Sequence, residues 1–166
     1  MKPLPKLAAS LIVCFAAVLS AAQADNATML QTLDGDERNL EHYLGQGKWS
    51  VIMMWAHDCH VCNQEAEQYA QFHEAHVEKQ ARVLGISIDG LEERQEAQQF
   101  VARHELPFPN LTAETDAVMR WFERQTGTRF LGTPTFLVYG PDGKLKAAQA
   151  GAVPASAIEK FIAENS

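Results

Sequence analysis

The chemistry of this sequence is concentrated in two cysteines three positions apart, Cys59 and Cys62. The third cysteine, Cys14, lies in an apolar N-terminal stretch. The usual structural zinc site needs four ligands, and the sequence has no second cysteine pair to complete one. A c-type haem attachment needs a histidine directly after the second cysteine, where this chain has Asn63. A disulfide closing so short a loop adds little stability, so the pair is better explained as a reactive dithiol.

The elements predicted around the two thiols favour this reactivity. Residues 49–56 form an apolar run typical of a strand buried on both faces. A long helix is predicted from 60 to 79, because no Gly or Pro interrupts it and apolar residues recur at helical spacing. Cys59 would then lie at the helix N-terminus, where free N–H groups and the helix dipole stabilise a thiolate. We expect an exposed Cys59 to attack and a shielded Cys62, one turn further on, to resolve the mixed disulfide.

A second motif, Gly-Thr-Pro-Thr at 132–135, leads into a predicted strand over 135–139. A proline at the start of a central strand is unusual, because it has no N–H to donate. A cis Thr133–Pro134 bond, with the backbone turning sharply beside the thiols, would explain its position. The alternative is an ordinary trans proline in a turn.

The rest of the chain alternates between strand and helix. A hairpin turn is predicted at 33–36 and a short helical turn at 39–44. The order of elements implies an α/β fold in which helices flank a central mixed β-sheet. The other predicted elements are a strand over 82–89, helices over 91–104, 115–125 (with Thr115 as N-cap) and 154–164, and a strand over 144–149.

The N-terminus is typical of an export signal. Lys2 and Lys6 precede an apolar run that ends in the small-x-small pattern at 22–24. The run is shorter than the roughly 20 residues of a spanning helix. We therefore predict a signal peptide over 1–24 and one domain over 25–166, in a periplasmic or otherwise exported protein with no stable membrane span. An uncleaved N-terminal anchor is the alternative.

The overall composition is that of a globular protein. Hydrophobic residues make up 46% of the chain, enough for a packed core. The 14 Lys and Arg residues are outnumbered by 21 Asp and Glu residues, which gives a net charge of −7. Nucleic-acid binding is disfavoured, since it requires a positively charged surface.

The Trp-Ala-x-x-Cys-x-x-Cys segment from Trp55 to Cys62, together with the later Thr-Pro-Thr-Phe-Leu segment, resembles the thioredoxin superfamily. Pro134 follows Cys59 at a longer separation than in minimal thioredoxins, and a helix-bearing insert around residues 90–122 accounts for the excess. With the export signal and the N-terminal β-hairpin, the chain resembles the exported TlpA/ResA-type thiol–disulfide oxidoreductases. That resemblance implies a thioredoxin-like fold, reduction of protein disulfides, a membrane thiol electron donor and no cofactor beyond the two thiols.

The resemblance also assigns roles to residues. It makes Cys59 the nucleophile, Cys62 its resolving partner in a Cys59–Cys62 disulfide, and Pro134 the cis-proline beside that disulfide. Glu65 matches an acidic residue that tunes the thiols and relays protons, although a solvated helix position is the plainer interpretation. Trp55 would pack near the disulfide.

Some positions depart from the family pattern. Met53 stands where thioredoxin has a buried Asp, so Glu65 is the candidate proton acceptor for Cys62. A cationic His60 would favour the Cys59 thiolate and a more oxidising protein, whereas the negative charge of Asp58 acts in the opposite direction. Thr133 also occurs in disulfide isomerases. The alternatives are therefore a disulfide oxidant or isomerase and, from another class, a non-enzymatic carrier of a soft metal such as copper.

Overall fold

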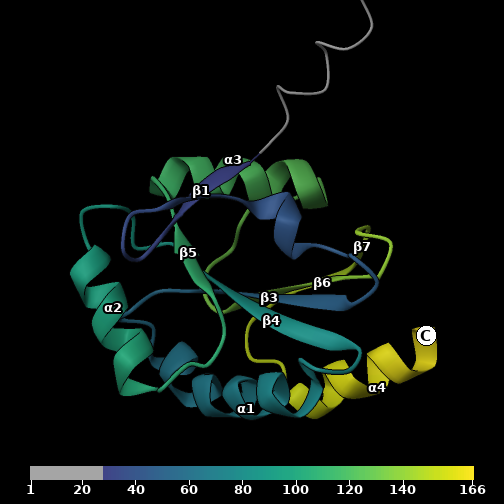
Figure 1. Cartoon of the computed structure of the whole chain (residues 1–166). Helices are drawn as coiled ribbons and strands as arrows, with labels where there is room; N and C mark the ends of the chain where they lie inside the picture. Colours follow the sequence, from purple (N-terminus) through teal and green to yellow (C-terminus); the bar gives the residue numbers. More distant parts are fainter. Residues whose placement is uncertain (1–27) are drawn as a thin grey trace, which may run out of the picture.

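A central sheet with helices against both faces forms the body of the protein (Figure 1). The computed structural model describes residues 28–166, in which seven strands follow the order β2-β1-β5-β4-β3-β6-β7 across the sheet. β3 pairs in parallel with β4 and antiparallel with β6, so the sheet is mixed, as predicted. The strands are β1 (Met29–Thr32), β2 (Glu37–Asn39), β3 (Trp49–Trp55), β4 (Ala81–Ser87), β5 (Asn110–Thr112), β6 (Thr135–Tyr139) and β7 (Leu145–Ala150).

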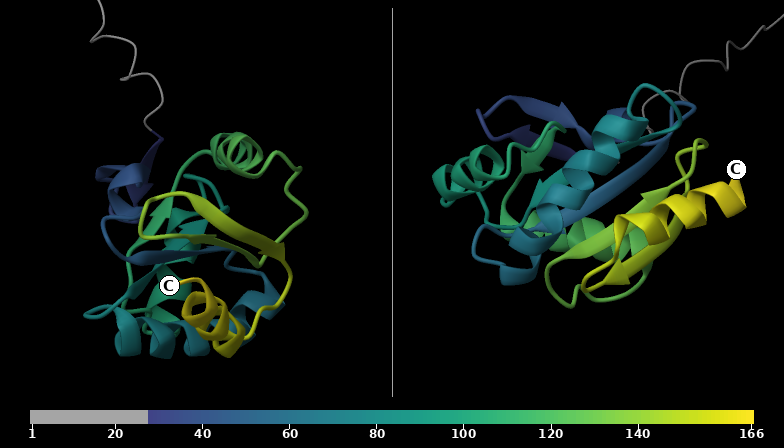
Figure 2. Two further views of the ribbon diagram at one scale, coloured as in Figure 1. Left: turned by 90° about the vertical axis from the view of Figure 1, so that its right-hand side faces the viewer. Right: turned by 90° about the horizontal axis from the view of Figure 1, so that it is seen from below.

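The helices divide between the two faces of the sheet. Side chains alternate across β3, so Met53 and Trp55 pack against the face that carries α1, α2 and α4, whereas Met54 faces α3. Figure 2 shows α1 and α4 lying side by side across the same face, where His76 bonds to Glu159. The helices are the 3₁₀ helix η2 (Leu40–Tyr43), α1 (His60–His76), α2 (Arg94–Arg103), α3 (Thr115–Thr126) and α4 (Ala155–Asn165).

The predicted N-terminal hairpin and the helix-bearing insert are both present. β1 pairs antiparallel with β2 and, on its other side, with β5, which brings the hairpin and the insert together. The insert at 90–122 contains α2, β5 and the first part of α3. β5 was not predicted, because three residues are too few to show a strand period. The N-cap prediction for Thr115 was wrong: its Oγ1 donates to Ile88 O, and Glu114 occupies the cap position without a side-chain bond.

Within residues 28–166, no helix is long and apolar enough to cross a membrane. The predicted signal peptide over 1–24, which includes Cys14, lies outside the described residues.

Candidate active site

The segments that carry the predicted site residues meet at one edge of the sheet. β3 ends at Trp55, which is paired with Ser87 at the end of the parallel strand β4. β6 runs the opposite way, and its first residue, Thr135, pairs with Met54. The turn after β3, the loop after β4 and the Thr133–Pro134 bond therefore lie at the same edge.

Cys59 and Cys62 form a disulfide at the start of α1, with their Cα atoms 5.2 Å apart. Cys59 is the N-cap of the helix, and its Sγ accepts a hydrogen bond from the Cys62 N–H at 3.0 Å. Cys62 is fully buried, whereas Cys59 is partly exposed. The predicted difference in exposure is confirmed. In the reduced protein the same N–H and the helix dipole would stabilise a Cys59 thiolate.

The Thr133–Pro134 peptide bond is cis, as predicted. Pro134 is buried, and its carbonyl accepts from the Gly151 N–H at 2.8 Å, which ties this loop to the end of β7. Thr133 is half-buried, and just before it Leu131 is 84% exposed. This loop therefore offers both polar and apolar contacts at the edge where the disulfide lies.

Trp55 lies in the core behind the site. Its ring stacks on Phe100 at a centroid distance of 4.2 Å, and its Nε1–H donates to Asn110 Oδ1 at 3.1 Å. This arrangement needs a glycine at position 85, because a Cβ there would lie 2.8 Å from Trp55 Nε1 and 1.9 Å from Asn110 Oδ1. Trp55 thus supports the end of β3, just before the residues that lead to Cys59.

Glu65 lies one turn after Cys62 on α1, so the two side chains are helix neighbours. Its Oε2 is buried and has no hydrogen-bond partner among residues 28–166. Met53, at the position of the missing acid, is fully buried in the cluster that includes Cys62. Burial raises the pKa of Tyr69, one turn further along α1, and the charge of Glu65 raises it further. Glu65 is therefore not a fully solvated helix residue.

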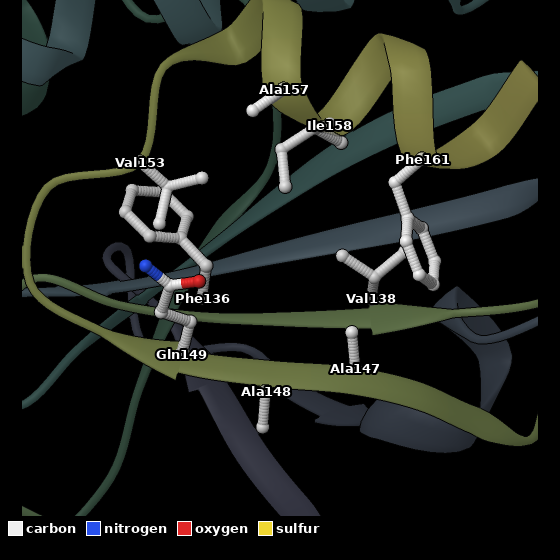
Figure 3. A pocket seen from close by; sticks show the side chains of 9 residues that line it. All are labelled: Phe136, Val138, Ala147, Ala148, Gln149, Val153, Ala157, Ile158 and Phe161. Atoms are coloured by element: carbon white, nitrogen blue, oxygen red, sulfur yellow. The ribbon is translucent and has the colours of Figure 1, made fainter.

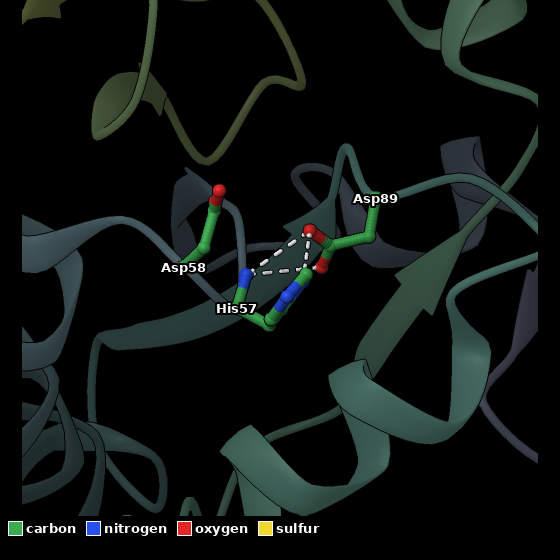
Figure 4. A group of neighbouring side chains, drawn as sticks. All are labelled: His57, Asp58 and Asp89. Atoms are coloured by element: carbon green, nitrogen blue, oxygen red, sulfur yellow. Dashed lines mark hydrogen bonds and ion pairs between the residues drawn. The ribbon is translucent and has the colours of Figure 1, made fainter.

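Figure 4 shows a histidine–aspartate pair formed by His57, which lies between the end of β3 and Cys59, and Asp89, which lies just after β4. His57 Nδ1 lies 3.0 Å from Asp89 Oδ1, and the His57 backbone N–H donates to the same carboxylate. Ser87 Oγ also donates to Asp89, at 2.7 Å. Burial lowers the pKa of His57, but the hydrogen bond and charge of Asp89, followed by the charges of Asp58 and Glu93, outweigh burial and raise it above its ordinary value.

The same residues bear on the question of a metal. His57, Asp58 and Asp89 offer ligand atoms within 4.8 Å of one another. Both oxygens of Asp89 already accept hydrogen bonds, so a cation would have to displace them. The thiols that the metal-carrier interpretation requires are joined to each other in the disulfide.

Sequence reasoning missed the roles of Asn63 and Asp89. Asn63 Nδ2 donates to the carbonyls of Cys59 and His57, and its Oδ1 lies 2.8 Å from His104 Nε2. Asp89 follows the strand parallel to β3, and that position at a shared strand edge was the available signal. His60, which was predicted to influence Cys59, is exposed at the first position of α1.

An apolar groove opens between the β6–β7 hairpin and α4 (Figure 3). It begins at Phe136, two residues after Pro134, and Val153 lines the same end. Figure 3 shows Phe161 reaching from α4 toward Val138, whereas Ala148 points away on the other side of β7. The groove thus extends from the cis-proline side of the site toward the end of α4.

Residues 21–148 match the AhpC/TSA family. Comparison with curated protein sequences gave no match. Solved structures with a similar fold include a thioredoxin-family thiol:disulfide interchange protein from Chlorobium tepidum, with a TM-score of 0.70 and 17% identity over 83% of this chain and 92% of that one.

Two further structures come from other bacteria. A secreted Mycobacterium tuberculosis disulfide oxidoreductase, described as homologous to E. coli DsbE, has a TM-score of 0.62 and 22% identity over 82% of this chain and 94% of that one. An exposed lipoprotein thioredoxin from Streptococcus pneumoniae has a TM-score of 0.66 and 19% identity over 83% of this chain and 98% of that one. At these identities the likeness establishes the thioredoxin-like fold.

Proposed function

Because the chain belongs to the AhpC/TSA family, we propose that it is an exported thiol–disulfide oxidoreductase that reduces disulfides in protein substrates. The observation that carries this proposal is the Cys59–Cys62 disulfide at the N-terminus of α1, in which Cys59 is partly exposed and Cys62 is fully buried. The similar structures support it, since three of them are described as a thiol:disulfide interchange protein, a disulfide oxidoreductase and a thioredoxin.

The reaction uses the two thiols in sequence. The Cys59 thiolate attacks one sulfur of a substrate disulfide, the substrate S–S bond breaks, and the leaving substrate thiolate takes a proton. Cys62 then passes its proton to Glu65 and attacks Cys59 Sγ. This step releases the second substrate thiol and closes the Cys59–Cys62 bond. Two electrons have moved from the dithiol to the substrate, and no further cofactor is required.

The substrate would dock where Thr133, Pro134 and the exposed Leu131 share the sheet edge with Cys59. Electrons would return from a membrane thiol carrier, consistent with an exported protein whose predicted signal peptide covers residues 1–24. Cleavage after residue 24 would be seen as the mass of the mature chain, whereas an uncleaved chain would indicate the membrane-anchored alternative.

The direction of electron flow is tested by the reduction potential of the Cys59–Cys62 pair, measured by equilibration with a thiol–disulfide buffer. A potential near the thioredoxin value of about −270 mV supports a reductase. A potential near the DsbA value of about −120 mV would instead show an oxidant or isomerase. A native mass of the reduced protein that includes bound copper would favour the metal carrier.

A further inference from the structure

We propose that His57, held in place by Asp89, is a third functional residue of the redox centre: as a cation it stabilises the Cys59 thiolate, and the pair gives the site a charge that changes with pH. This inference deepens the proposed function and rests on it in one respect, the identity of Cys59 as the attacking thiol. Asp89 acts through His57 and is therefore a positioning residue.

The backbone holds His57 close to Cys59. The Cys59 N–H donates to Ala56 O at 3.2 Å, so residues 56–59 form a tight turn whose ends lie within about 7 Å of each other. Asn63 Nδ2 fastens the turn by donating to His57 O at 3.4 Å and to Cys59 O at 2.9 Å. Position 57 lies inside this turn, two residues before Cys59. We infer that a charge on its side chain is near enough to Cys59 for screening by salt, with a Debye length of about 8 Å, to be incomplete.

The side chain of His57 is fixed but still reached by solvent. The Asp89 side chain is only 2% exposed, and its carboxylate is bonded by the His57 backbone N–H, the His57 ring and the Ser87 hydroxyl. Asp89 thereby fixes the imidazole through Nδ1, at 3.0 Å. Because 27% of the His57 side chain is exposed, the ring can exchange protons with water.

The charged groups around His57 determine how the pair titrates. Asp89 faces it from the loop after β4, Glu93 from the start of α2 with Oε2 at 3.5 Å, and Asp58 from its own turn. From the far end of α2, Arg103 and His104 contact Asn63 Oδ1, at 3.3 and 2.8 Å. The pKa of His57 is raised, so near neutral pH its ring is protonated in a larger fraction of molecules than an ordinary histidine would be. In those molecules the positive His57 and the negative Asp89 give the pair no net charge. At higher pH the pair carries one negative charge.

Reduction of the Cys59–Cys62 disulfide is accompanied by proton uptake at Cys62 and His57. When a thiol donor supplies two electrons, the Cys59–Cys62 bond breaks, Cys62 takes one proton, and Cys59 remains a thiolate. The new negative charge raises the pKa of His57, which takes up part of a second proton from water. Since coupling between sites is reciprocal, protonated His57 stabilises the thiolate by the same amount. Reoxidation by a substrate disulfide releases the Cys62 proton and the fraction of a proton that His57 took up, and these pass to the substrate thiolates or to water.

The test is the rate at which iodoacetamide alkylates Cys59 in the reduced full chain, measured from pH 4.5 to 9 for the parent and two variants. His57→Gln leaves the negative charge of Asp89 without its cation, so the alkylation rate of Cys59 near pH 6 should fall about threefold. The profiles of this variant and the parent should converge at high pH, where His57 is neutral. Asp89→Asn removes the anion, so it should increase thiolate formation. The charge pair therefore predicts opposite shifts, whereas damage to the turn would shift both variants in the same direction.

Control variants distinguish an electrostatic effect on Cys59 from damage to the fold. His76→Gln removes a histidine paired with Glu159 at the other end of α1, and its profile should superimpose on the parent. If Asp89→Asn does not fold, Glu93→Gln, at a position 57% exposed, should give a smaller shift of the same sign. All profiles are repeated with EDTA, and a change on chelation would mean that the cluster holds a cation, which would overturn the proposal.

A second measurement is the pKa of the His57 imidazole by NMR in the oxidised and reduced protein. It should be about half a unit higher in the reduced form. Equal values in the two redox states, or variant shifts of the same sign, would overturn the role of His57. If Cys62 is alkylated before Cys59, the thiol assignment of the proposed function fails instead. Cys59 labelling that is unchanged in both variants refutes only the role of His57.

Discussion

Replacing Glu65 with Gln should make the protein more stable and less active. The carboxylate has one buried oxygen without a hydrogen-bond partner among residues 28–166, an arrangement that costs folding free energy. The same carboxylate lies one helical turn from Cys62, where it is the proposed proton acceptor. Gln has nearly the same shape but carries no charge and cannot take the proton.

The expected magnitudes follow from these two roles. An unsatisfied buried polar atom costs about 1–3 kcal/mol, and more when it is charged. Gln keeps a polar atom at this position but removes the charge, so the free energy of unfolding should rise by roughly 1 kcal/mol. For a domain of this size that corresponds to a rise in Tm of about 3 °C. General acid–base groups contribute about 10²- to 10⁴-fold to rates. Because water can partly replace a lost base, resolution of the mixed disulfide should slow by about 10- to 100-fold.

Two assays separate these effects. Urea unfolding of the oxidised protein gives the stability, and stopped-flow resolution of a mixed disulfide between Cys59 and a peptide thiol gives the rate. Glu67→Gln is the matched control, since Glu67 is exposed on the same helix and its carboxylate only accepts from Gln71 at 3.1 Å. It should change neither quantity. Unchanged stability and unchanged resolution in Glu65→Gln would refute the reasoning and make Glu65 a plain helix residue.

Three further predictions concern the thiols and the core beneath them. Limiting iodoacetamide should label Cys59 before Cys62 in the reduced protein, because Cys62 is fully buried; peptide mass mapping would show the order, and preferential labelling of Cys62 would reverse the assignment. His73→Leu should cost about 1–3 kcal/mol, because His73 Nδ1 accepts the Val83 N–H. Burial lowers the pKa of His73 in the folded state, so the parent loses stability as pH falls from 6.5 toward that lower pKa. The difference in the free energy of unfolding between the parent and His73→Leu, measured in urea, should therefore narrow over that range, and a constant difference would contradict this. Gly85→Ala should cost at least about 2 kcal/mol and alter tryptophan fluorescence, because a Cβ 1.9 Å from Asn110 Oδ1 would break the hydrogen bond from Trp55 Nε1 to that oxygen. Urea unfolding like that of the parent would mean that Asn110 can move freely.

Several features of this protein can be predicted from the order of residues along short segments of the chain. The apolar run at 49–56 and the uninterrupted helix after it placed Cys59 at a strand-to-helix junction, and helical spacing placed Cys62 on the inward side. Both follow from periodicity, because a buried strand and an amphipathic helix leave distinct patterns in consecutive residues. The cis Thr133–Pro134 bond was also predicted, from a proline at an otherwise unsuitable strand position.

Which distant residues surround the disulfide depends on the way the strands are arranged in the folded sheet. Asp89 is 32 positions from His57, and the two meet because β3 and β4 are parallel neighbours that end at the same edge. Asn110, 55 positions from Trp55, meets it because the short strand β5 joins the sheet beside β4. Neither contact leaves a periodic signal, since side-chain hydrogen bonds between residues far apart in the sequence depend on strand order and register, which are set by packing across the whole sheet.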